Sequence, residues 1–587
     1  MKKLFTIILC LAMTLVSCDK DDSSSFNPEP QPHNPNTFSE YFGSEIQRNF
    51  LGKVMDTDRN PIEGVTITIG TKTAMTDANG IFIINDATVN EHFGYVKASK
   101  PGYLHGSRSV VPSSGTNKVT IMMLPETVAG TTTSGTAETI TLPDGASVAL
   151  EGEYQKADGS AYSGSVNVIM HHLDPSSEDM QVQMPGMLYA ANAQNEPRML
   201  QTFGMLAVEL RGSGGEELNI AEGSSAEIKL PLDASLMANA PSTIPLWHFD
   251  EQYGYWIEDG VATLVGNTYI GTVTHFSFWN CDIPAEYVNL CVNVLDADGN
   301  ALAYVTVSIQ SNMYGTAYGT TNANGQVCGI IPANETLVVR ATDDGQCGGD
   351  YYYEGNIGPF NSDDTVTINI TDSGGYVTQT VFGNFTSCNG DPVVNGYVKL
   401  TNGYNQFIGN LEDGAFEFNI VTCLNDEQFK LYGVDYANLQ ETDSISYTFT
   451  PPITNIGTLA ACNTVEEFIT YQVDDHPAVT YNFDISGGLD VDYLGFYVSS
   501  PNQSTFFQIS IAPFTSQGSY PFATINFFDE NNDSTTLEYA FQGIVNVTEF
   551  GGVGDYVDIN FSGNLVDLNG SIPNTPIIGT MHVRRDY

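Results

Sequence analysis

Basic residues are scarce in this chain of 587 residues. It has 20 lysines and arginines against 69 aspartates and glutamates, so its formal net charge at pH 7 is −49. Nucleic acid and anionic lipid surfaces are therefore poor partners, because little in the composition offsets the repulsion between carboxylates and phosphates. An acidic surface by itself indicates solubility and no particular ligand.

Catalytic and cofactor-binding motifs are missing. No His-Glu-x-x-His, Gly-x-Ser-x-Gly, P-loop or dinucleotide fingerprint occurs in the sequence. We therefore predict no catalytic residue, no cofactor and no resident metal. Paired carboxylates cannot be picked out among 69 acidic residues, so inspection of the sequence leaves a glycosidase open.

Long helical patterns and membrane-length apolar runs are missing as well. The apolar run over residues 4–16 follows two lysines and ends at Ser17-Cys18. It is shorter than the roughly 20 residues that cross a bilayer, so residues 1–17 are predicted to be a cleaved signal peptide. The composition of residues 18–45, rich in Ser, Pro, Asn and Gln, predicts a flexible tether.

The residues around Cys18 suggest where the mature protein is attached. Leu-Val-Ser-Cys resembles the lipobox of bacterial lipoproteins, which implies that Cys18 is lipidated and becomes the N-terminus. Residues 20–22, Lys-Asp-Asp, resemble the export signal of Bacteroidota-type surface lipoproteins. Asp19 would instead favour the inner membrane under enteric-type sorting. We favour the outer membrane, with the chain facing outward.

Cysteines outside the signal peptide and the anchor all lie between residues 281 and 462. Close Cys-x-x-Cys pairs of the zinc-site kind are missing, and an exported protein meets an oxidising compartment, so disulfides are favoured. Because their number is odd, at least one thiol stays free or pairs with another chain. The candidate disulfide cysteines are Cys281, Cys291, Cys328, Cys347, Cys388, Cys423 and Cys462.

Apolar residues alternate with a period close to two almost everywhere, which predicts an all-β protein. Val65, Ile67 and Ile69 share one face of a strand, and Asn79-Gly80 suits a tight hairpin turn. The same succession of strand, turn and strand recurs before residues 324–325 and, more loosely, before residues 413–414. Three related modules are predicted.

The first copy resembles the carboxypeptidase regulatory-like domain, on Gly52 to Asp56, Pro61, Gly64-Val65, Thr76-Asp77 and Asn79-Gly80. The resemblance implies small transthyretin-like β-sandwiches without catalysis of their own. It covers residues 46–125 well, 286–371 moderately and 372–463 weakly, since the third copy lacks Thr-Asp before its turn.

Two further segments complete the predicted organisation. Residues 126–285 contain all three tryptophans. They resemble a β-rich extracellular segment of bacterial lipoproteins and cartilage intermediate layer-like proteins, with no implied activity. Residues 464–587 are predicted to form a terminal β-sandwich. The expected fold is thus a series of tandem β-sandwich domains, transthyretin-like or Ig-like, behind a lipidated tether.

Several polar runs partly resemble metal sites, but each has a structural interpretation. Residues 296–300 and 529–533 begin like calcium loops but lack the Gly and Glu that an EF-hand needs at its sixth and twelfth positions, so solvated turns are expected. Neighbouring His171 and His172 point to opposite faces of a strand. His248 and His275 are assigned to an aromatic core.

Three short sequences resemble the O-glycosylation sequon of Bacteroidota exported proteins. Each is an aspartate followed by Ser or Thr and then an apolar residue or Thr. The acceptors would be Thr365, Ser444 and Ser534.

Two functional hypotheses follow. The first is a non-enzymatic outer-membrane surface lipoprotein for adhesion, or for glycan or protein binding, through its tandem modules. The alternative is a hydrolase or an accessory subunit of a polysaccharide-degrading surface complex.

If the modules run in a line from Cys18, the C-terminal domain lies farthest from the membrane. Its loops near residues 502–507 and 517–520 are then the expected binding site.

Overall fold

The computed structural model describes residues 33–586, apart from residues 343–350, 372–375, 404, 425, 439, 465–467, 474–478, 482–484, 492, 500–505, 529–536, 553–555 and 568–574. The signal peptide, Cys18, Cys347, Ser534 and the calcium-like run 529–533 lie outside these residues.

The structure is nearly all β, as predicted. Within the described part the helical elements are α1 (Pro35–Phe38), α2 (Met180–Gln183) and the 3₁₀ turn η1 (Ser39–Phe42), and no helix there could span a membrane.

The first module is a sandwich of two sheets around one core. Strand order in the sheets is β4-β1-β7 and β3-β2-β5-β6. Val65, Ile67 and Ile69 are fully buried in the core, as their alternation predicted. The strands are β1 (Glu45–Met55), β2 (Thr66–Ile69), β3 (Lys72–Met75), β4 (Ile81–Asn90), β5 (Gly94–Ser99), β6 (Gly106–Val110) and β7 (Thr116–Met122).

The second and third modules have the same topology, with sheets β24-β21-β27 and β23-β22-β25-β26, then β31-β28-β35 and β30-β29-β32-β33-β36 with β34 beside β32. In all three, the first strand pairs in parallel with the last strand of its sheet. The strands are β21 (Tyr287–Leu295), β22 (Thr306–Gln310), β23 (Thr316–Thr320), β24 (Gln326–Pro332), β25 (Leu337–Thr342), β26 (Tyr353–Ile357), β27 (Asp364–Asn369), β28 (Tyr376–Ser387), β29 (Gly396–Asn402), β30 (Asn405–Asn410), β31 (Ala415–Cys423), β32 (Gln428–Asp435), β33 (Gln440–Glu441), β34 (Ile445–Thr448), β35 (Ile453–Ala461) and β36 (Asn463–Thr464).

Residues 126–285 form a single 13-stranded sheet with a hydrophobic core on each face. Its three tryptophans are fully buried. The strands are β8 (Val128–Thr133), β9 (Glu138–Thr141), β10 (Ser147–Leu150), β11 (Tyr154–Lys156), β12 (Ser165–Leu173), β13 (Tyr189–Ala191), β14 (Pro197–Gly212), β15 (Glu217–Ile220), β16 (Ala226–Pro231), β17 (Thr243–Asp250), β18 (Tyr255–Val265), β19 (Thr268–Val273) and β20 (Phe278–Ala285).

The C-terminal segment differs from the two-sheet sandwich expected of it. Its described strands form one nine-stranded antiparallel sheet that encloses its own core. Gly543 and Gly563 face each other so closely that a Cβ on either would lie 2.5 Å from the other's Cα, which permits strong curvature. The strands are β37 (Phe468–Val473), β38 (Val479–Tyr481), β39 (Ser486–Asp490), β40 (Tyr493–Ser499), β41 (Phe506–Ile511), β42 (Gly518–Phe528), β43 (Leu537–Phe550), β44 (Tyr556–Asp567) and β45 (Thr575–Arg584).

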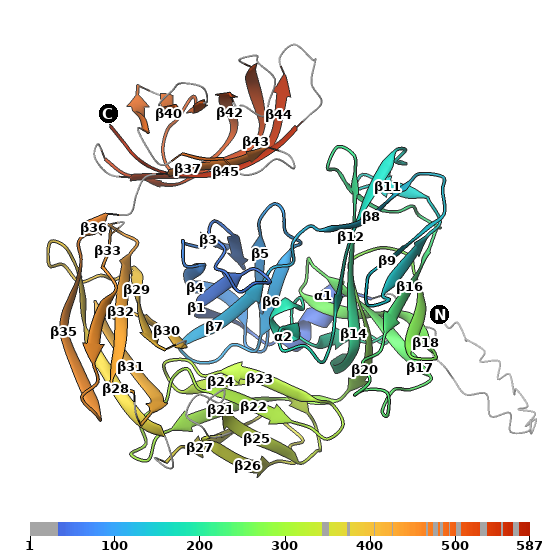
Figure 1. Ribbon diagram of the computed structural model, residues 1–587, viewed down its shortest axis with the longest axis horizontal. Coiled ribbons are helices and arrows are strands. Elements are labelled where there is room, and N and C mark those ends of the chain that lie inside the picture. The colour runs from blue at the N-terminus through green and yellow to red at the C-terminus, as the bar shows by residue number, and fades with distance from the viewer. Residues whose placement is uncertain are drawn as a thin grey trace, which may run out of the picture.

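The modules do not run in a line. The first module lies at the centre, and the 126–285 domain and the second and third modules surround it (Figure 1). An apolar cluster joins Leu51 and Ile81 of the first module to Tyr397, Ile408 and Val434 of the third. The assumption that the modules run in a line, which placed the C-terminal domain farthest from the membrane, is therefore wrong. Strands β1 and β4 have apolar side chains on both faces, and they bury the outer face against another module.

The predicted turn of the first module makes a polar junction with the third. Asp77 accepts hydrogen bonds from the backbone N–H groups of Asn79 and Ile81, which shapes the turn. Its other oxygen accepts from the hydroxyls of Tyr397 at 2.7 Å and Tyr436 at 3.2 Å. Burial raises the pKa of Asp77, and these four donors partly oppose that shift.

Lys118 of β7 contacts both other modules. Its ammonium group donates to the carbonyl of Ile408 at 2.6 Å and lies 5.0 Å from the ring centre of Tyr304. The Tyr304 hydroxyl donates to the same carbonyl at 2.7 Å. Burial lowers the pKa of Lys118 to about 7.

We expect Lys118 to make stability depend on pH. Its folded pKa lies below its unfolded value, so its contribution is present at high pH and is lost as pH falls toward about 7. The free energy of unfolding should rise by up to about 1.4 kcal/mol per pH unit above pH 7, and Lys118→Met should remove that slope. Urea unfolding at several pH values checks this, and parallel slopes for the two proteins would contradict it.

Part of the predicted tether is folded. Phe38 is fully buried and Phe42 is 8% exposed, in a cluster with Phe93, Tyr189 and Tyr255. Phe42 and Phe93 stack with ring centres 4.2 Å apart. The prediction of a tether over residues 18–45 is therefore wrong for residues 33–45, because the side chains of Phe38 and Phe42 in this polar segment bury apolar area between domains.

Among the described residues, Cys291 pairs with Cys328 and Cys388 with Cys462, and Cys423 is also disulfide-bonded. Cys281, one of the candidate disulfide cysteines, is instead a free, fully buried thiol. It lies in the core of the 126–285 domain, which contains no other cysteine with which it could pair. Burial raises the pKa of this thiol.

Candidate binding site

A pocket of about 460 Å³ opens where the N-terminal segment meets the first module, the 126–285 domain and the second module. Four chain segments far apart in sequence therefore build it. The side chains that matter below are Tyr41 of η1, His92 between β4 and β5, Arg198 of β14, Tyr287 and Asn289 of β21, and Asp363 just before β27.

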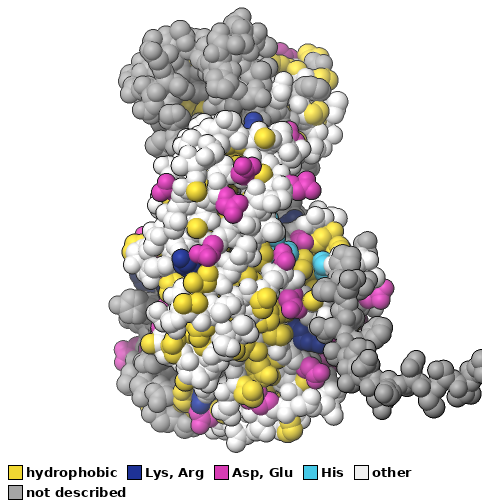
Figure 2. Space-filling model, turned by 90° about the vertical axis from the view of Figure 1, so that its right-hand side faces the viewer, with side chains coloured by type: hydrophobic (Ala, Val, Ile, Leu, Met, Phe, Trp, Pro, Cys, Tyr) yellow, Lys and Arg dark blue, Asp and Glu magenta, His cyan; other side chains and the backbone are white. Residues whose placement is uncertain are grey.

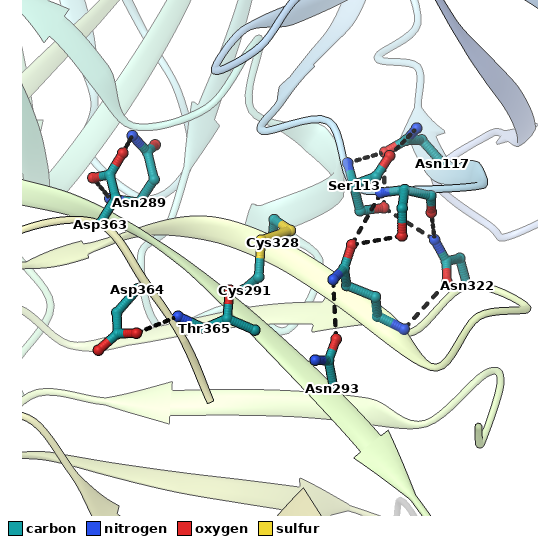
Figure 3. Close-up of a disulfide and its surroundings, with 12 residues drawn as sticks. Ser113, Asn117, Asn289, Cys291, Asn293, Asn322, Cys328, Asp363, Asp364 and Thr365 are labelled. Carbon is teal, nitrogen blue, oxygen red and sulfur yellow. Dashed lines mark hydrogen bonds between the residues drawn. A yellow bond between two sulfur atoms is a disulfide. The ribbon is translucent and has the colours of Figure 1, made fainter. Parts of the chain in front are cut away.

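Asn289 and Asp363 form a hydrogen-bonded pair in the pocket. The carboxylate of Asp363 accepts from the backbone N–H of Asn289 at 2.8 Å and from its side-chain amide at 2.9 Å (Figure 3). The Oδ1 atom of Asn289 is buried and has no partner within the described structure. A buried acceptor atom without a partner favours a ligand that donates a hydrogen bond to it.

The Cys291–Cys328 disulfide lies close to this pair in the same sheet (Figure 3). Cys291 is two residues from Asn289, so the two side chains share a face of β21. The disulfide joins β21 to its partner β24. Cys328 also packs against the aromatic cluster around Phe38. The disulfide thus links β21, which lines the pocket, to a strand that contacts this aromatic cluster.

Two tyrosines contribute aromatic surface. Tyr287 is held in place, because its hydroxyl donates to that of Tyr189 at 3.2 Å and the two rings meet edge to face. Burial raises the pKa of Tyr287. Tyr41 is 45% exposed and packs edge-on against Phe38. The ring of Tyr41 is therefore accessible to a ligand and rests on a buried side chain.

The pocket combines aromatic rings, amides, a carboxylate and a guanidinium group. Arg198 donates to the carbonyl of Pro197 at 2.8 Å and pairs with Glu196 at 2.6 Å. Such a set offers both donors and acceptors beside apolar ring faces. It suits a polyhydroxylated ligand better than a purely apolar or purely ionic one.

A second hollow of about 740 Å³ lies on the 126–285 domain. Glu138, Glu151 and Glu227 line it, together with small residues and no aromatic ring. The view onto this side of the molecule shows acidic side chains scattered among few basic ones (Figure 2). Without aromatic surface or a basic group, this hollow is the weaker candidate.

His171 and His172 have separate partners, whereas His248 and His275 lie together. His171 bonds the carbonyl of Pro125 at 2.7 Å, whereas His172 bonds Asp144 at 2.9 Å, so the two do not share a site. His248 and His275 both pack against Trp279, in line with the aromatic core assigned to them.

The remaining predicted residues also have definite positions. Asp296 accepts from the backbone N–H groups of Asp298 and Asn300, which makes the run a turn of the expected kind. Thr365 and Ser444 are exposed.

The predicted binding loops of the C-terminal domain are only partly described. Residues 502–504 lie outside the described structure. Phe507, beside them, is fully buried in the domain core, and Tyr520 packs partly against it. Both side chains therefore contribute to packing.

Glu209 of β14 is a buried carboxylate in the 126–285 domain, outside both pockets. Burial raises the pKa of Glu209 to about 7. Its carboxylate pairs with Arg211 at 2.5 Å, and Arg211 also pairs with Glu126 at 3.2 Å. Glu209 lines neither pocket, so the group fits a structural ion-pair network.

Sequence reasoning missed Tyr41, Asn289 and Asp363 as a group. No local motif joins them, because the pocket exists only once four segments have packed. One signal was available. Phe38, Tyr41 and Phe42 stand close together in a segment otherwise rich in polar residues, and such residues are usually buried.

Comparison with known proteins gives only distant likenesses. No protein-family model matches the chain. Mouse (Mus musculus) cartilage intermediate layer protein 2 is 29% identical over 110 residues, which is 19% of this chain and 9% of that protein. The chain thus spans about a tenth of the length of this curated relative.

Among solved structures, the GBS52 minor pilin of Streptococcus agalactiae aligns with 30% of this chain and 96% of its own, at 9% identity and a TM-score of 0.13. The BcpA major pilin of Bacillus cereus aligns with 72% of this chain and 100% of its own, at 9% identity and a TM-score of 0.12. These scores are too low for any function to be transferred.

Proposed function

We propose that the chain is a non-enzymatic surface protein for adhesion, which captures a glycan in the pocket between Tyr41 and Asp363. The observation that carries the proposal is the composition of this pocket, which is lined both by the exposed aromatic ring of Tyr41 and by Asn289, whose amide oxygen is buried and unpartnered in the described structure. Sugar hydroxyls donate to such an oxygen, and the apolar face of a sugar ring packs on an aromatic side chain. No catalytic group is needed.

Glycan binding is tested with an array of polysaccharides and oligosaccharides on the full mature chain in detergent. For a glycan that binds, Tyr41→Ala and Asp363→Asn should each weaken the affinity about tenfold or more, because residues at the centre of a contact contribute over 1 kcal/mol. Tyr318→Ala is the matched control, since this tyrosine of β23 is 58% exposed and does not line the pocket.

The outcomes of this experiment separate the two functional hypotheses. Binding that is equal in Tyr41→Ala and Tyr318→Ala would remove the pocket as the site. Binding lost on truncation after residue 463 would restore the C-terminal domain as the recognition module. Cleavage of the bound glycan, abolished by one carboxylate substitution, would support the hydrolase alternative.

Membrane attachment through Cys18 is the second part of the proposal. We expect Cys18→Ser to leave the protein unlipidated and released from the membrane fraction, because acyl chains on this residue would be the attachment. Cell fractionation and metabolic labelling with a fatty acid check this. Protease added to intact cells should digest the unaltered protein. Full protection would contradict exposure on the outer face while leaving lipidation intact.

A further inference from the structure

Three metal-binding side chains converge in the 126–285 domain, away from the proposed glycan pocket. His248 lies in β17, Asp259 in β18, and His275 in the turn between β19 and β20. Nδ1 of His248 and Nε2 of His275 lie 3.9 Å and 4.0 Å from the same carboxylate oxygen of Asp259. The two imidazole rings meet edge to face, with centres 4.5 Å apart.

An irregularity in the sheet brings Asp259 to the two histidines. Pro245 pairs with Val261, but Trp247 pairs with Glu258, so Leu246 faces both Asp259 and Gly260. Gly260 has a φ of +94°, which permits this extra residue on β18. A bulge of this kind redirects neighbouring side chains and is common next to functional sites.

The site also contains an unsatisfied buried atom. Nδ1 of His248 is inaccessible to solvent and has no hydrogen-bond partner in the described part of the chain. Asp259 is too distant to accept a hydrogen bond from it. A bound ion is a common reason for such an atom.

We propose that His248, Asp259 and His275 bind a divalent transition metal of the zinc class, with one coordination position open to solvent. Two imidazole nitrogens and one carboxylate oxygen form a ligand set that suits zinc better than calcium or magnesium. Ligand atoms of a tetrahedral zinc site lie about 3.4 Å apart, given bonds of about 2.0–2.2 Å. Here all three lie within 4.8 Å of one another, so small side-chain rotations complete the site.

The surroundings of the site allow access and limit motion. The side chain of Asp259 is 50% exposed, which gives an ion a path from solvent, whereas that of His248 is 18% exposed. Both histidines pack against Trp279, and His248 is also the backbone pairing partner of Trp279 across β17 and β20, which holds the two residues side by side. The metal would join β17, β18 and the turn between β19 and β20.

Zinc titration of the metal-free full chain in detergent, followed by isothermal calorimetry, tests the proposal. We expect saturable binding of one zinc ion per chain, and at least tenfold weaker binding by Asp259→Asn and by His275→Gln. Asp144→Asn is the matched control, because Asp144 also pairs with a histidine, His172, in the same domain. It should leave zinc binding unchanged. Cobalt substitution should give the absorption of a tetrahedral ion in the unaltered protein only.

The proposal fails if the unaltered chain binds no zinc, or if zinc binding persists in a variant that carries both Asp259→Asn and His275→Gln. Circular dichroism of each variant shows whether it is folded. Loss of binding in a variant that keeps the unaltered spectrum supports the site. Because the glycan pocket lies elsewhere, binding to the glycan array should be the same with and without zinc.

Discussion

Tyr397→Ala is expected to separate the third module from the first and to lower the free energy of unfolding by about 3–5 kcal/mol. Tyr397 is fully buried, yet it alternates along β29 with Val398 and Leu400, which fill the core of its own module. Its ring therefore packs against the neighbouring module. The alanine would also deprive the carboxylate of Asp77 of its closest side-chain donor.

Tyr397→Phe is the matched control for this prediction. It keeps the ring and removes only the hydroxyl, so it should cost about 1–3 kcal/mol and leave the modules together. Urea unfolding measures the stability, and small-angle X-ray scattering measures the overall dimensions. Equal dimensions of the alanine variant and the unaltered protein would contradict the inferred junction.

Removal of the Cys388–Cys462 disulfide should have an effect of similar size. The two cysteines are 74 residues apart, so the crosslink limits a long loop of the unfolded chain and contributes about 4 kcal/mol. We expect the double variant Cys388→Ala and Cys462→Ala to lower the melting temperature of the third module by about 20 °C. Differential scanning calorimetry checks this.

Reduction of the unaltered protein supplies the comparison. Both cysteines are exposed, so a reductant can reach them and should reproduce much of the destabilisation. Cys281→Ala is the control, since this buried free thiol forms no crosslink and its substitution should leave the response to reductant unchanged. An unchanged melting temperature in the double variant would show that the disulfide does not constrain this module.

Local patterns predicted the strands and turns of the repeats because the physical causes are local. Val65, Ile67 and Ile69 face one core, and Gly80 has the positive φ of 71° that its turn requires. Thr76 accepts from the N–H of Val65 and donates to the carbonyl of Ile62, and Thr321 of the second copy makes the equivalent two bonds. The third copy keeps the topology without this threonine, because sheet pairing decides the fold.

What the sequence did not predict depends on contacts between domains. Strand β1 has Phe50 on its inner face and Leu51 on its outer face, and alternation alone does not reveal what covers the second. The polar composition of the N-terminal segment concealed the burial of Phe38. Asp259 was not predicted as a ligand from the sequence. Gly260 hints at a bulge there, but only the folded sheet shows that this bulge brings Asp259 to His248 and His275.

The parallel pairing of first and last strands has a mechanical consequence. In the first module β1 and β7 pair from Asn49–Thr116 to Met55–Met122 and run in the same direction. Tension applied to the two ends of the module pulls these neighbouring strands in opposite directions along their length. The hydrogen bonds between them then carry the load together, in shear, instead of breaking one after another. The same arrangement in β21–β27 and β28–β35 gives all three modules this resistance to stretching.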